Sequence, residues 1–142
     1  MKYKTENELT KIVEAFENRT FSRKNWRHTD HLVVGNYYLS EHDFDTALLK
    51  MREGIFKLLH SFEIDLSKEM EGYHETLTVF WLKTIDDFRK SKTSASNLES
   101  CNEIIENFDK DYPLKFYSRE LLFSDDARAK FVESNLKVKC DY

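Results

Sequence analysis

Three histidines and one glutamate are the residues of this chain whose types and spacing best suit chemistry. His28 and His31 lie three positions apart in a stretch with helical periodicity. Their imidazoles therefore project from one helix face, with Cβ atoms about 5–6 Å apart, and can reach one ligand. His74 precedes Leu77 on the apolar face of a later predicted helix, and Glu75 stands beside it. We expect the two helices to direct these side chains into one site.

Imidazole and carboxylate groups are the ligands that suit a divalent transition metal such as Zn, Fe, Mn or Ni. One interpretation is therefore a single metal ion bound by His28, His31, His74 and Glu75, with space for water or substrate. In an enzyme of this kind, Glu75 would act as the fourth ligand or as a general base. The chain lacks the His-Glu-x-x-His pattern of zinc proteases and the paired Glu-x-x-His helices of di-metal bundles, so a dinuclear centre is not expected.

A pocket without metal is the second interpretation. A histidine such as His74 would serve as general acid or base near pH 7, oriented by Glu75 or Asp30. Arg27 could anchor an anionic group of the substrate. Aromatic residues near these positions would form the ligand-binding wall, and they are Trp26, Tyr38, Tyr73 and Trp81.

The histidines also have a purely structural interpretation. Each could be a core histidine whose ring nitrogens bond Asp30, Glu75, Thr78 or tyrosine hydroxyl groups and hold one helix against the next. Aromatic residues at helical spacing are more often core packing than a cofactor site. The chain would then be a non-catalytic interaction or scaffold protein, with an exposed apolar patch and no deep polar pocket. The sequence leaves these interpretations open, and with them the question of whether the chain is an enzyme.

Periodic apolar residues predict the helices that position these side chains. The expected helices cover about residues 6–18, 26–39, 44–62, 73–90 and 98–108, with two short segments at 117–122 and 124–133. Asp43 is the expected cap of the third helix, and Asn25 or Thr29 that of the second. The helix over 26–39 is apolar on nearly every side, so it should lie at the centre together with the helix over 73–90. Residues 64–71 and 91–97 are expected to be loops, and the chain from Ser134 onward to be extended.

The composition favours helices and a core of ordinary size. The 142 residues include only 3 Gly and 1 Pro, so tight hairpin turns are poorly supplied. We therefore predict an all-α fold in which residues 1–142 form one compact domain, a bundle of about five to six helices. The net charge of −4 comes from interspersed charges of both signs, so nucleic acid is not an expected partner.

The chain carries no predicted membrane or export segment. No apolar run approaches the roughly 20 residues of a membrane span, and the N-terminus lacks the apolar core of a signal peptide. Cys101 and Cys140 lie far apart and match no zinc-binding spacing, which suits two free thiols in a reducing compartment. We therefore expect a cytoplasmic protein without membrane contact, for which a small molecule is the favoured partner.

Three stretches of the chain resemble a known family. They are Trp26–Leu32, Gly72–Trp81, and Tyr117–Ser124 with the following Ala127 and Arg128. These stretches are similar to the signature segments of a family of small bacterial helical proteins whose activity is uncharacterised. The resemblance spans most of the chain and includes the three histidines and Glu75. It implies no activity, cofactor or partner. Where members of that family carry an acidic residue and Pro before Leu near the end, this chain has Ser134, Asn135 and Leu136.

Overall fold

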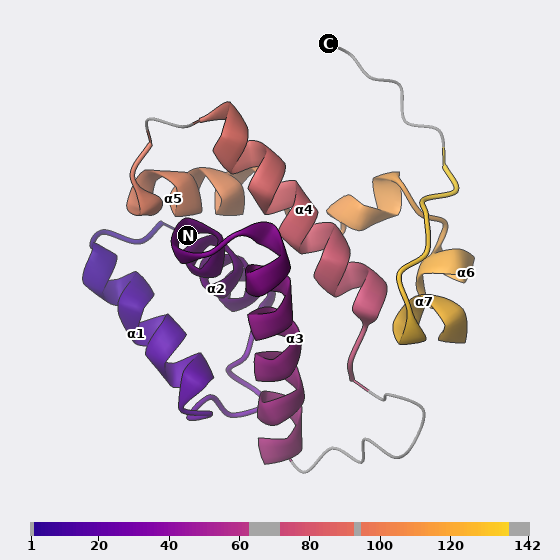
Figure 1. Cartoon of the computed structure of the whole chain (residues 1–142), viewed down its shortest axis with the longest axis horizontal. Helices are drawn as coiled ribbons and strands as arrows, with labels where there is room; N and C mark the ends of the chain where they lie inside the picture. The colour runs from indigo at the N-terminus through magenta and orange to yellow at the C-terminus, as the bar shows by residue number, and fades with distance from the viewer. Residues whose placement is uncertain (1, 63–71, 93–94, 137–142) are drawn as a thin grey trace.

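The computed structural model describes residues 2–62, 72–92 and 95–136, and these residues form an all-α fold, as predicted. Its elements are α1 (Glu6–Glu17), α2 (His28–Glu41), α3 (Phe44–Ser61), α4 (Glu75–Ser91), α5 (Asn97–Asn107), the 3-10 helix η1 (Tyr112–Lys115), α6 (Arg119–Leu122) and α7 (Asp125–Ala129) (Figure 1). In the described part of the chain, no helix combines the length and apolar character needed to cross a membrane.

Helix α2 lies at the centre and packs against α1, α3, α4 and α5 (Figure 1). Its apolar residues Leu32, Val33 and Val34 are almost completely buried, which agrees with the nearly uniform apolar surface predicted from the sequence. Gly35 permits a close approach of α4, because a Cβ atom there would lie 3.0 Å from Cδ1 of Ile85. At Gly35 the backbone of α2 therefore lies close to side chains of α4, at the wall of the site described below.

The helix starts follow their capping residues. The predicted cap of α3 is confirmed, because the Asp43 carboxylate accepts a hydrogen bond from the Thr46 backbone N–H at 2.8 Å. The predicted caps of α2 are wrong: α2 begins at His28, and Arg27 occupies the cap position. The backbone N–H of Arg27 donates to Oδ2 of the buried Asp30 at 2.9 Å, so a carboxylate inside the first turn stabilises this start.

The C-terminal part of the described chain packs on α4 through short elements. Pro113 breaks the helical pattern as expected, and η1 forms around it. The final helix is shorter than predicted, because α7 ends at Ala129 and the following backbone bonds to a side chain of α4. The Thr76 hydroxyl donates to the Lys130 carbonyl at 2.9 Å and accepts from the Val132 N–H at 3.1 Å.

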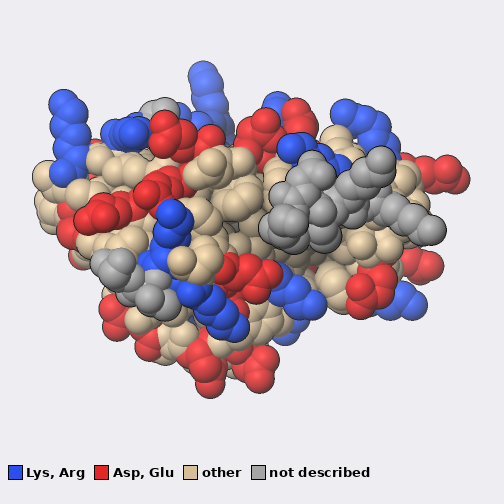
Figure 2. Space-filling model, turned by 90° about the horizontal axis from the view of Figure 1, so that it is seen from above, with Lys and Arg blue, Asp and Glu red and all other residues tan. Residues whose placement is uncertain are grey.

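Some expectations lie wholly or partly outside the described residues. The loop expected at 64–71 lies there entirely, as do positions 93–94 of the second expected loop and positions 137–142 of the tail. Cys101 is buried and unpaired, whereas Cys140 belongs to the undescribed positions. On the face shown in Figure 2, acidic and basic side chains are interspersed over the described surface, without a block of one sign.

Candidate functional site

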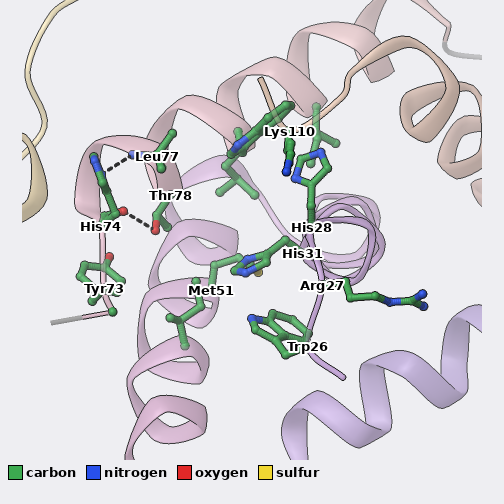
Figure 3. Close-up of a pocket in the computed structure, with 16 residues that line it drawn as sticks. Trp26, Arg27, His28, His31, Met51, Tyr73, His74, Leu77, Thr78 and Lys110 are labelled. Atoms are coloured by element: carbon green, nitrogen blue, oxygen red, sulfur yellow. Dashed lines mark hydrogen bonds between the residues drawn. The ribbon is translucent and has the colours of Figure 1, made fainter. Parts of the chain in front are cut away.

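A cavity of about 340 Å³ lies between α2, α3 and α4 (Figure 3). Its volume falls at the small end of the range typical of small-molecule sites. The wall combines the start of α2, the start and middle of α4 and two residues of α3, Met51 and Ile55. Most of the lining is apolar or aromatic, with a few polar groups among it, which is the usual composition of a ligand pocket.

His31 is the polar side chain that stands out in this wall. Its ring lines the cavity and packs on Trp26 with ring centroids 4.4 Å apart. Neither of its ring nitrogens forms a hydrogen bond within the described residues. Burial, together with a smaller effect of the nearby His28, lowers the pKa of His31 to about 4. At neutral pH the imidazole is therefore uncharged and offers one N–H donor and one lone pair.

His28 lines the same cavity, so the structure brings the two histidines of α2 together as predicted. Its Nε2 donates to the Phe108 carbonyl at 3.2 Å, which leaves the lone pair of the neutral ring on Nδ1. The ring lies against Trp81 with centroids 4.7 Å apart. Burial lowers the pKa of His28, while the Phe108 carbonyl and Asp109 oppose this effect and Lys110 adds to it.

His74 holds one helix against another, as in the structural interpretation, rather than acting as a metal ligand or general base. It is the N-cap of α4, and its Nδ1 accepts a hydrogen bond from the Leu77 N–H at 3.1 Å. Its Nε2 donates to the Leu122 carbonyl at 2.5 Å, so the ring ties the start of α4 to the end of α6. Burial lowers the pKa of His74, and Arg128 lowers it further against the Leu122 carbonyl. The ring contributes to the cavity wall, but both of its nitrogens are occupied.

Glu75 follows His74 in the chain but belongs to another group of contacts. Its carboxylate accepts from Nε and Nη2 of Arg52 on α3, at 3.0 and 2.5 Å, and from the Tyr73 hydroxyl at 2.5 Å. Burial raises the pKa of Glu75, but the hydrogen bonds from Arg52 and Tyr73 outweigh it, so the net pKa is below the usual value. Glu75 is therefore an ionised partner of α3 and does not line the cavity.

These contacts decide how well the predicted metal ligands fit a metal. Within residues 2–62, 72–92 and 95–136, no group of three or more His, Cys, Asp or Glu side chains is arranged to hold an ion. The four predicted ligands thus do not converge, because His74 bonds to the backbone of α4 and α6 while Glu75 pairs with Arg52. The described residues do not fit a divalent metal at this place.

The remaining predicted ligand contacts divide into two groups. Trp26, Tyr73 and Trp81 line the cavity, as expected for an aromatic wall. Arg27 lines it too, but its side chain extends away from His31 and Trp26 in Figure 3 and pairs with Asp30, at 3.7 Å between Nε and Oδ2.

Tyr38 lies two helical turns beyond His31, about 10 Å along the axis of α2, and does not reach the cavity. Its hydroxyl donates to Oε2 of Glu17 on α1 at 3.0 Å. Tyr38 therefore belongs to the core between α1, α2 and α3 rather than to the candidate site.

Sequence reasoning missed several lining residues. Met51 and Ile55 belong to the regular apolar stripe of α3, and the pattern does not show which part of a stripe faces a cavity. Lys110 follows the end of α5 and has no motif around it. Only the folding of the α5–η1 connection over the start of α2 brings Lys110 to the cavity.

Comparison with known proteins adds no assignment to this geometry. The chain matches no family model, no curated protein and no solved structure. The family resemblance of its sequence segments therefore stays a prediction, and the cavity is the feature that bears on function.

Proposed function

We propose that this protein binds a small organic molecule in the cavity between α2, α3 and α4. The observation that carries the proposal is His31, an imidazole in an apolar wall whose ring nitrogens form no hydrogen bond with a described residue. A polar group in such surroundings costs free energy unless it forms a hydrogen bond. A ligand with a hydrogen-bonding group would supply the partner that the described residues do not.

The remainder of the wall supports a ligand with an apolar or aromatic body. Each tryptophan packs on one of the two histidines: Trp26 on His31, and Trp81 on His28. Gly35, backed by Leu82 and Ile85, lines the cavity without adding a side chain of its own. Aromatic and aliphatic groups of this kind bind flat apolar molecules, while the imidazoles determine their orientation.

The protonation chemistry supports binding more than acid–base catalysis. A general base works best with a pKa near the working pH, whereas the pKa of His31 is about 4. Both nitrogens of His74 are committed to the backbone, and Glu75 is paired with Arg52. The two residues predicted as catalytic therefore have no free group directed at a bound molecule.

The rival class, a scaffold protein, would be supported by a large exposed apolar patch. The large hydrophobic side chains exposed in the described part of the chain are Leu49, Phe123 and Leu136, which come from three separate segments. Scattered single residues of this kind are ordinary on protein surfaces. The cavity is accordingly the better supported candidate for a functional feature.

Tryptophan fluorescence tests the proposal directly, because the chain has only 2 Trp residues and both Trp26 and Trp81 line the cavity. The probes are p-cresol and benzyl alcohol, neutral aromatic molecules whose hydroxyl can pair with a neutral imidazole. We expect saturable quenching that weakens about tenfold in His31→Leu, because one hydrogen bond is lost.

The matched control is His60→Leu, which removes an exposed histidine in the last turn of α3 and should leave binding unchanged. Circular dichroism of each variant confirms that it is folded. Absence of saturable quenching by both probes, or equal binding by parent and His31→Leu, would overturn the proposed function.

A further inference from the structure

The electrostatic character of the cavity depends on the helix starts near it and on the side chains that line it. The first turns of α2 and α4 contribute side chains to the cavity wall, α2 through His28 and His31 and α4 through Leu77 and Thr78, and the wall continues along the sides of both helices. A helix N-terminus carries a partial positive charge from its aligned peptide dipoles and unpaired N–H groups. Because the cavity lies along the sides of both helices, the charges of the side chains around it decide which ligand it favours.

The acidic side chains of these two turns are already neutralised. Asp30 pairs with Arg27 at 3.7 Å, and Glu75 pairs with Arg52 at 2.5 Å. Neither carboxylate lines the cavity, and none of the described lining residues is acidic. Neither helix start therefore places an unpaired carboxylate at the cavity.

Lys110 adds a positive charge to the wall of the cavity. It lines the cavity, is exposed to solvent and forms no ion pair with a described residue. Its charge acts on His28, and the two residues lie next to each other in Figure 3. The neighbouring Asp109 also acts on His28, but it does not line the cavity, and its Oδ1 accepts from the Asp111 N–H at 3.0 Å.

From this arrangement we infer that the ligand is a small organic anion, a monocarboxylate with an apolar or aromatic body, whose carboxylate lies beside Lys110 and His28. The inference rests on the proposed function and names the class of molecule that the cavity takes. The apolar body extends from there between Trp26 and Trp81. The arrangement of one cationic end and an apolar interior suits an amphipathic acid better than a neutral or cationic molecule.

His28 gives the bound carboxylate a second donor. Its Nε2–H is committed to the Phe108 carbonyl, and Nδ1 has no partner within the described residues. An anion beside Lys110 favours protonation of Nδ1, which then donates to the carboxylate while the proton comes from solvent. Binding of the acid is thus coupled to proton uptake, governed by the groups that act on His28, namely His31, Asp109 and Lys110.

The test compares three probes of equal size and different charge: hydrocinnamate, its neutral amide hydrocinnamamide, and the cationic phenylpropylamine. Their dissociation constants come from quenching of Trp26 and Trp81. We expect the acid to bind at least about tenfold more tightly than the amide, and the amine most weakly. Calorimetry in buffers of different ionisation enthalpy should show proton uptake with the acid and none with the amide.

The variant Lys110→Gln should reduce the preference for the acid to within about threefold and leave binding of the amide unchanged. Lys115→Gln is the matched control, since it removes an exposed charge five positions away, above the Tyr112 ring. A preference for the acid that survives Lys110→Gln, or falls equally in both variants, would overturn the placement of the carboxylate.

The outcomes also separate this inference from the proposed function. Equal or tighter binding of the amide overturns the anionic class and leaves the cavity as a binding site. The same conclusion follows if p-cresol binds and none of the three new probes does. If p-cresol and benzyl alcohol both fail to quench, the proposed function is overturned, and this inference falls with it.

Discussion

Acidification should destabilise this protein through His31, and the structure sets both the sign and the size of the effect. Burial lowers the pKa of His31 from the ordinary value of 6.5 to about 4, so the unfolded chain binds a proton more tightly than the folded one. Stability contributed by the neutral imidazole is therefore complete above about pH 6.5 and is lost as the pH falls toward about 4.

The magnitude follows from linkage. Each pH unit between the two pKa values corresponds to about 1.4 kcal/mol for one proton. The contribution of His31 to the free energy of unfolding should thus fall by about 2 kcal/mol between pH 7 and pH 5, and by about 3 kcal/mol at pH 4. Losses of this size are a large part of the stability of an ordinary domain.

The assay is urea unfolding followed by circular dichroism, on the parent chain and on His31→Leu, between about pH 7 and pH 5. Burial also lowers the pKa of His28 and His74, but these groups titrate in both proteins and their effects largely cancel in the difference. We expect the parent to lose about 2 kcal/mol relative to His31→Leu over this range. Parallel stability curves for the two proteins would show that water in the cavity solvates the ring and would refute the reasoning.

Four further outcomes follow from particular contacts. Gly54→Ala should lower the free energy of unfolding by about 1–3 kcal/mol in urea titrations, because the new Cβ would lie 2.3 Å from the Phe16 ring. Arg52→Met should cost about 1–3 kcal/mol by the same assay, since it leaves the Glu75 carboxylate without its charged partner, and adding Glu75→Gln should recover part of the loss. Added Zn²⁺ should leave the Tm of the chain unchanged in thermal melts, as the predicted ligands do not converge; a rise in Tm would contradict this geometry. Cys101, whose thiol is buried with a pKa raised to about 12, should react with iodoacetamide rapidly in urea and slowly in buffer, as followed by mass spectrometry of its peptide.

The regular features of the fold were predictable from local sequence. Apolar spacing located each of the longer helices to within about two residues, because a buried helix face imposes its period on the chain. The same rule placed His28 and His31 side by side, since residues three apart on a helix share a face. Local patterns failed at the start of α2, where Asp30 stabilises the first turn from inside the helix.

Tertiary structure alone decided which of the predicted site residues meet. His74 and Glu75 are neighbours in sequence, yet His74 bonds to the Leu122 carbonyl and Glu75 to Arg52 on α3. Lys110 reaches the cavity only because the segment after α5 folds over the start of α2. The physical reason is separation along the sequence. Periodicity reports only which residues a few positions apart share a helix face. The partner of a buried polar group, in contrast, comes from whichever distant segment packs against it.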